Sequence, residues 1–321
     1  MMRRAVTLVE LLVAMVLALA LLAAVYSFYL AFLNQNSRQR VKAETLKEVR
    51  EAFRILEDDV RHAGFGYPKT GCENKGICLF YVDDECNVGD ETFCKDGTDR
   101  FFVADGWQVI KDFTTDHAPD GNIPDSVYEQ LVSREIFADV TSYTDGSTFI
   151  DVDRLDVDND SAHTKDIKMR KAIIVCGRKN NNGVLQEGRR IEKIEGSGPY
   201  KLVFNSKENF LYGKYDCSAS SKGLVIPANV WYVRKADDGK YWLYRNEQKV
   251  LPNVEDFQVH VGYDENGDGV VEENEWTNRG SLPDNADPKR LKFFWFEIKV
   301  AYYWKGKKYQ VNYTMRVDAF H

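Results

Sequence analysis

The most distinctive feature of the hydropathy pattern is a long apolar stretch near the N-terminus. It extends from Val6 to Leu33, and Glu10 is its one charged residue. Its 28 residues would form a helix of about 42 Å at about 1.5 Å per residue, whereas about 20 apolar residues suffice to span a bilayer. Arg3 and Arg4 precede the stretch, which predicts a cytoplasmic N-terminus and a C-terminal part beyond the membrane.

Two ordinary interpretations of this stretch compete with a functional one. A cleaved secretory signal would use the small residues Ala18 and Ala20, but the apolar stretch continues well past them. A simple membrane anchor has reason to avoid Glu10, because a carboxylate in the hydrocarbon costs a few kcal/mol. An ionisable residue inside a membrane span therefore indicates a function.

The apolar pattern changes after Leu33 but keeps a helical period. Between residues 34 and 64 the chain is polar, with apolar residues at steps of three to five that form one face. These residues are Val41, Leu46, Val49, Phe53, Leu56, Val60 and Ala63. Neither glycine nor proline occurs before Gly64, which is placed to end the helix. We therefore expect one helix from Val6 to Ala63.

Beyond residue 100 the pattern shifts to short alternating and aromatic segments typical of strands. The predicted strands are Arg100–Val103, Ser147–Val152, Lys171–Cys176, Tyr200–Asn205, Asn229–Lys235, Tyr241–Asn246, Val254–Tyr263, Lys292–Trp304 and Lys308–Val317. The last two, joined by a short turn at Gly306, are predicted to form a hairpin beneath the helix. The predicted fold class is thus α+β, with a long N-terminal helix on an antiparallel β-sheet domain spanning residues 101–321.

Six cysteines and an acidic balance narrow the class of protein. The cysteines are Cys72, Cys78, Cys86, Cys94, Cys176 and Cys217. Their even number, four of them within the loop region 65–100, favours disulfides in an oxidising compartment. Zinc is disfavoured, because the spacings lack close Cys-x2-Cys pairs. We expect Cys176 to pair with Cys217, and the first four among themselves. The net charge of −7 argues against nucleic acid as a partner.

The residues around Glu10 give the pattern a more specific meaning. The segment Ala5-Val6-Thr7-Leu8-Val9-Glu10-Leu11-Leu12-Val13-Ala14-Met15 resembles the prepilin processing motif. The resemblance implies that a prepilin peptidase removes the leader 1–5, cutting between Ala5 and Val6 and methylating the new amine. Glu10 then becomes the fifth mature residue. This carboxylate would pair with the Val6 amine of a neighbouring subunit, which contributes more to register than to net stability.

A second resemblance concerns the end of the helix. The segment from Glu48 to Tyr67 is similar to PilW-type minor pilins. It implies a type IV pilin-like fold with disulfide-stapled loops, and a minor subunit that primes or caps pilus assembly. The implied partners are other minor pilins, the major pilin, the inner-membrane assembly platform and, before assembly, membrane lipid. The expected location is the inner membrane with a periplasmic C-terminal domain, and later the extracellular pilus.

One further motif indicates metal chemistry. Residues 264–275 match the EF-hand-type calcium loop. The expected ligands are the side chains of Asp264, Asn266, Asp268, Glu272 and Glu275 and the carbonyl of Val270. Such oxygen-only ligands favour calcium over transition metals. The alternative is a metal-free hairpin, since Asn-Gly and Asp-Gly are strong turn formers.

No catalytic motif is present in the sequence, so we expect no enzymatic activity. The histidines are scattered, without His-Glu-x-x-His, and Gly-x-Ser-x-Gly is lacking. Two alternatives to the minor-pilin hypothesis stay open. One is a type II secretion pseudopilin, which would have the same kind of N-terminal segment. The other is a calcium-dependent adhesin displayed on a filament.

Overall fold

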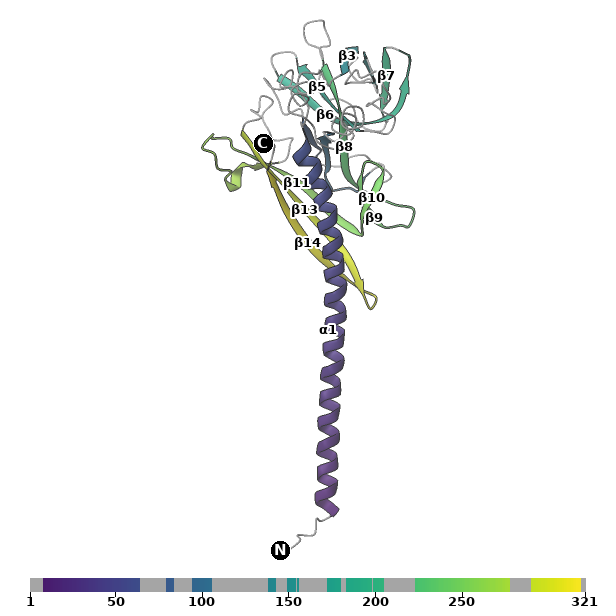
Figure 1. Ribbon diagram of the computed structural model, residues 1–321, viewed down its shortest axis with the longest axis vertical. Helices are drawn as coiled ribbons and strands as arrows, with labels where there is room; N and C mark the ends of the chain where they lie inside the picture. Colours follow the sequence, from purple (N-terminus) through teal and green to yellow (C-terminus); the bar gives the residue numbers. More distant parts are fainter. Residues whose placement is uncertain are drawn as a thin grey trace, which may run out of the picture.

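The computed structural model describes residues 8–63, 79–83, 94–105, 138–142, 149–153, 155, 172–179, 183–197, 199–204, 223–277 and 290–318. A single helix, α1 (Leu8–His62), dominates its shape, and antiparallel strands surround the C-terminal end of that helix (Figure 1). The predicted α+β class and the long N-terminal helix are confirmed.

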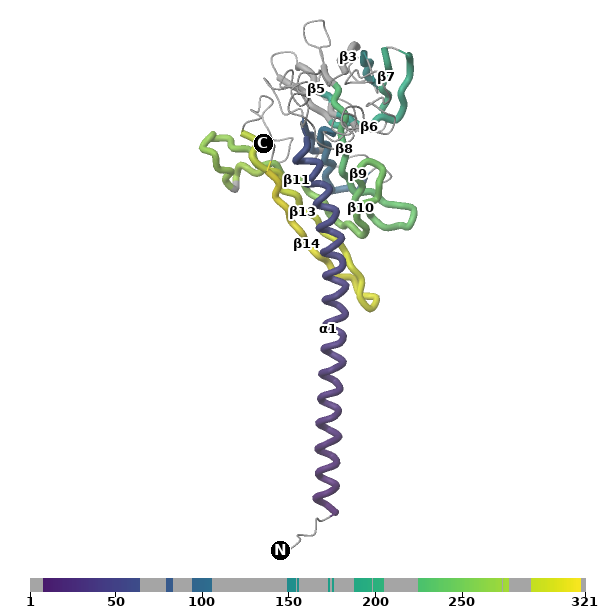
Figure 2. Tube along the Cα trace, in the orientation of Figure 1, coloured from purple at the N-terminus to yellow at the C-terminus, as the bar shows by residue number. Residues whose placement is uncertain are grey.

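The two halves of α1 have different surroundings. The N-terminal half extends away from the strands, whereas the C-terminal half lies against them (Figure 2). The predicted apolar face accounts for the change: Val49, Phe53, Leu56 and Val60 are all fully buried or nearly so. The sequence from Leu8 to His62 contains neither glycine nor proline, so nothing interrupts the hydrogen bonds of the helix.

The first sheet contains ten of the described strands. They are β1 (Phe80–Asp83), β2 (Arg100–Ala104), β3 (Ala138–Ser142), β4 (Phe149–Val152), β5 (Ala172–Lys179), β6 (Gly183–Glu195), β7 (Tyr200–Phe204), β8 (Gly223–Lys235), β9 (Tyr241–Arg245) and β10 (Gln248–Pro252). The long strand β8 organises the sheet, because Val225 pairs with β3 on one edge and with β5 on the other. The pairings β8-β3-β4-β7-β6-β5-β8 therefore form a closed ring.

The second sheet lies next to α1. Its order is β12-β11-β13-β14, comprising β11 (Val254–Tyr263), β12 (Trp276–Thr277), β13 (Leu291–Trp304) and β14 (Lys307–Asp318). A short 3-10 helix, η1 (Glu273–Glu275), precedes β12. The predicted hairpin is confirmed, since β13 and β14 pair from Phe293↔Asp318 to Trp304↔Lys307. Lys305 and Gly306 connect them with φ of 50° and 73°, the positive values that a two-residue hairpin turn requires.

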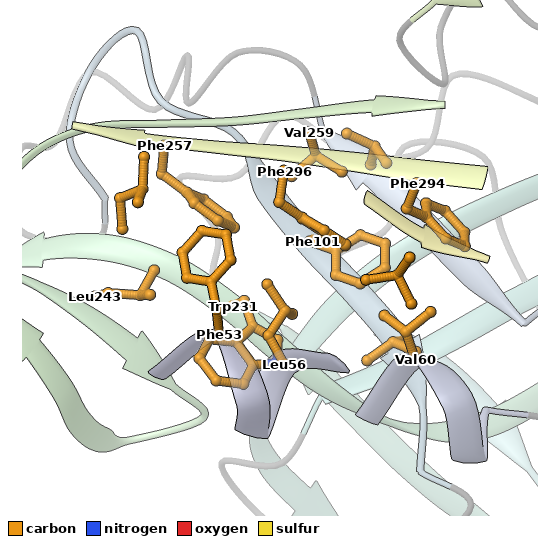
Figure 3. Packing of buried hydrophobic residues seen from close by; sticks show 14 of the residues in the cluster. Phe53, Leu56, Val60, Phe101, Trp231, Leu243, Phe257, Val259, Phe294 and Phe296 are labelled. Carbon is orange, nitrogen blue, oxygen red and sulfur yellow. The ribbon is translucent and has the colours of Figure 1, made fainter. Parts of the chain in front are cut away.

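The main core lies where α1 meets both sheets. Phe53, Leu56 and Val60 of the helix face Phe257, Val259, Phe294 and Phe296 of the second sheet (Figure 3). Phe101, Trp231 and Leu243 of the first sheet complete this cluster. The alternation of strand side chains explains the layering, because Phe101 and Val103 enter this core while Phe102 and Ala104 enter a second cluster on the other face.

Candidate functional site

The N-terminal half of α1 presents apolar side chains in every direction. Its large hydrophobic residues, from Leu8 to Leu33, are between 42% and 78% exposed. Each such side chain gains about 1.5–3 kcal/mol when it leaves water. A helix that is apolar all round belongs in a membrane or in a protein core. By length and composition, α1 is the one helix in the described part of the chain that could span a membrane.

The predicted processing and assembly residues lie at the start of this surface. Glu10 is in the first turn of α1, on the exposed part of the helix. A carboxylate there is favourably placed with respect to the helix dipole. Ala5 and Val6 lie outside the described residues, so cleavage between them and the pairing of Glu10 with a neighbouring amine stay predictions.

The tip of the β13–β14 hairpin holds α1 where its apolar half ends. The indole Nε1 of Trp304 donates to the Ser37 hydroxyl at 3.2 Å, and the Lys305 ammonium donates to Asn34 Oδ1 at 2.5 Å. The Arg38 guanidinium lies 4.0 Å from the centre of the Tyr309 ring. These contacts begin one residue after Leu33, so the hairpin marks the boundary between the free and the packed halves of the helix.

A buried carboxylate ties the other end of α1 to the first sheet. Asp59 is 2% exposed and accepts two hydrogen bonds from the Arg245 guanidinium, each of 2.7 Å. The Trp231 indole donates to the same carboxylate at 2.9 Å, and the Asn229 amide lies 3.5 Å from it. Strands β8 and β9 thereby hold the last turns of the helix through a charged network.

Burial raises the pKa of the Asp59 carboxyl above its ordinary value, while the hydrogen bonds from Arg245 and Trp231 act in the opposite direction. The pKa of Arg245 is also raised, chiefly by its hydrogen bond to Asp59. Asp59 was not among the site residues predicted from the sequence. A signal was present, because Asp59 continues the helical spacing of the buried residues Ala52 and Leu56. An acidic residue in an apolar face requires a buried partner.

The predicted calcium loop curls around its first and last carboxylates. Asp264 and Glu275 are both buried. Asp264 accepts from the backbone N–H groups of Gly267 and Gly269, whose positive φ values permit the curl. Glu275 accepts from the N–H groups of residues 265, 266 and 272. The backbone of the loop thus wraps around both carboxylates.

The other predicted ligands face solvent. Asn266 and Asp268 each accept the N–H two residues along, while Glu272 and Val270 are exposed. No three His, Cys, Asp or Glu side chains of the described residues are gathered so as to hold a metal ion. The Lys292 ammonium also lies 3.8 Å from Asp264. Calcium binding by this loop therefore stays a prediction.

The cysteine framework is described at one position. Cys94 is fully buried beside β2 and β8 and is disulfide-bonded. Cys72, Cys78, Cys86 and Cys217 lie outside the described residues, and the side chain of Cys176 is not described. The predicted pairing is therefore not tested.

Comparison with known proteins brings no relative. The chain matches no protein-family model, no curated protein and no solved structure.

Proposed function

We propose that this chain is a type IV pilin-like subunit of the minor class. It inserts the N-terminal half of α1 into the inner membrane, and it later joins a filament through that half of the helix. One observation carries the proposal: more than a third of a long helix is apolar on all sides and exposed, while the remainder is built into a folded domain. A surface of this kind requires a cover, first lipid and then the helices of neighbouring subunits.

The position of the one charge supports assembly over simple anchoring. Glu10 is the only charged residue between Arg4 and Arg38. An anchor gains nothing from it and loses a few kcal/mol of insertion energy. In a bundle of such helices, a cation from the next subunit would compensate the carboxylate and set the stagger between subunits. The resemblance of residues 5–15 to the prepilin motif supplies that cation, as the amine of Val6.

The attachment of the helix also suits a filament subunit. Three independent sets of contacts bind the C-terminal half of α1. The β13–β14 hairpin contacts the helix between Asn34 and Arg38. The apolar core around Phe53 and the Asp59–Arg245 pair are the other two. A force applied to the free half would therefore be passed directly to both sheets.

Replacing Glu10 by Ala tests this proposal. We expect Glu10→Ala to insert into the membrane like the natural chain but to be lost from sheared filaments, as measured by quantitative immunoblotting of the two fractions. The matched control is Glu44→Ala on the packed half of the same helix, where the Glu44–Arg40 pair is exposed and should be dispensable. Normal amounts of the Glu10→Ala chain in filaments would refute the pairing.

We further propose that the loop 264–275 binds calcium, with Asp264, Asn266, Asp268, Glu272 and Glu275 and the Val270 carbonyl as ligands. The inward, buried carboxylates of Asp264 and Glu275 support this, because they are the first and last ligands of such a loop. Bound calcium would supply a fixed positive charge that rigidifies the connection between β11 and β12. No catalytic role is proposed for it.

A further inference from the structure

The β13–β14 hairpin tip combines aromatic and basic side chains at one place. Tyr303 is 57% exposed, Trp304 is half-buried against α1, and Lys305 and Lys307 are exposed. Figure 1 shows this tip projecting from the folded part toward the free half of α1. We define these four residues, Tyr303, Trp304, Lys305 and Lys307, as the hairpin tip.

The contacts with α1 determine where the hairpin tip lies along the helix. It binds Asn34 and Ser37, directly after the apolar stretch that ends at Leu33. That stretch is about 42 Å long as a helix, close to the roughly 40–45 Å of a bilayer with its headgroup layers. An inserted helix therefore holds the hairpin tip at the outer edge of the headgroup layer.

The charges of the hairpin tip suit an anionic surface. Two basic side chains near the hairpin tip already have carboxylate partners: Lys308 pairs with Glu255, and Arg40 pairs with Glu44. Lys305 instead donates to the neutral Asn34 amide oxygen, which leaves its positive charge uncompensated by that contact. Lys307, across the register from Trp304, adds a second exposed charge. Each basic residue near an anionic membrane surface strengthens attachment by about fivefold.

The aromatic residues suit the same position. Tyr and Trp are enriched at membrane interfaces because their rings are apolar while their O–H and N–H groups are polar. Tyr303 and Trp304 are adjacent on β13 and point to opposite faces. Since Trp304 contacts the helix, Tyr303 points away from it and is exposed.

We infer that the hairpin tip is a second membrane contact, which binds the headgroups of anionic phospholipids and orients the folded domain on the bilayer before assembly. The inference rests on the proposed insertion of α1. It adds to that proposal a lipid-headgroup site on the folded domain, formed by Tyr303, Lys305 and Lys307.

Photo-crosslinking of the full chain in lipid nanodiscs tests the inference. The photoreactive residue p-benzoylphenylalanine replaces Tyr303 in one protein and Leu22, in the middle of the apolar half, in another. Nanodiscs contain phosphatidylcholine alone or mixed with phosphatidylglycerol, and mass spectrometry identifies the adducts. We expect the probe at position 22 to label lipid in both mixtures. At position 303, labelling should be severalfold stronger with phosphatidylglycerol.

Charge variants make the test specific. In the Lys305→Gln/Lys307→Gln protein, glutamine can still donate to Asn34, but the excess labelling by phosphatidylglycerol should disappear. The matched control is Lys193→Gln/Lys201→Gln, which removes the same charge from β6 and β7, at the end of the folded part remote from the hairpin tip (Figure 1). This control should label like the parent.

Each other outcome is decisive. Three results at position 303 would contradict the hairpin-tip inference while lipid labelling at position 22 still supports insertion. The first is equal labelling in both mixtures, and the second is labelling that the Lys305→Gln/Lys307→Gln change does not alter. The third is crosslinking to another protein chain alone. If position 22 labels no lipid in either mixture, the proposed insertion fails and the inference fails with it.

Discussion

The buried pair between Asp59 and Arg245 offers a direct test of how the helix is joined to the first sheet. The perturbation is Asp59→Ala. It removes the acceptor of two guanidinium hydrogen bonds and of the Trp231 indole, and it leaves the Arg245 charge in a site where that side chain is only 23% exposed. The donors of Arg245 and Trp231 would then need water molecules as new partners, or the strands that carry them would have to shift.

The expected magnitude follows from this burial. Removing one partner of a buried ion pair costs about 3–5 kcal/mol, and leaving a buried donor such as the Trp231 indole unpaired costs about 1–3 kcal/mol. The two costs overlap, because both arise from loss of the same carboxylate. We therefore expect the free energy of unfolding to fall by about 3–5 kcal/mol in Asp59→Ala.

The assay is urea unfolding of the oxidised full chain in detergent, followed by tryptophan fluorescence. The double variant Asp59→Leu/Arg245→Met should regain the part of the loss that comes from the unpaired charge, because apolar replacements of both partners leave no buried charge. The Trp231 indole still lacks its acceptor in this variant, so the recovery should be incomplete. The control is Glu57→Ala, which removes the exposed Glu57–Arg61 pair on the same turn of α1 and should cost less than about 1 kcal/mol.

Two results would contradict the reasoning. A loss below about 1 kcal/mol in Asp59→Ala would mean that the pair behaves like an exposed one. An equal loss in the double variant would mean that the unpaired Arg245 charge does not determine the energy of this contact.

Two further predictions concern other parts of the molecule. Gly188→Ala should lower the free energy of unfolding by about 1–3 kcal/mol, because a Cβ there would lie 2.3 Å from Cγ of the Phe102 ring; an unchanged urea midpoint would show that the ring can move aside. Millimolar calcium should raise the melting temperature of the parent chain, and chelation should abolish this effect. The effect should also be lost in Glu275→Gln but kept in Glu265→Gln, whose side chain is not a predicted ligand. A calcium effect in Glu275→Gln equal to that of the parent would refute the proposed site.

Local sequence patterns predicted the long helix and nine of the described strands. The helix is recognisable because neither glycine nor proline interrupts Leu8–His62 and its apolar spacing is regular. Val254–Tyr263 was predicted at its observed limits, and the β13–β14 hairpin was found because aromatic residues flank a turn at Gly306. Five described strands were missed: β1, which lies in the predicted loop region 65–100, and β3, β6, β10 and β12. The longest of them, β6, is rich in Arg, Lys and Glu and lacks alternation. It is held by its neighbours β5 and β7.

The candidate sites divide in the same way. The apolar half of α1, its single carboxylate Glu10 and the calcium-loop pattern are properties of consecutive residues, so the sequence alone determined them. The closed ring through β8, the partnership of Asp59 with Arg245 and the meeting of the hairpin tip with Asn34 join residues that are far apart in the chain. Only the tertiary structure decided these, because periodicity determines which face of an element is apolar but carries no information about which distant element covers it.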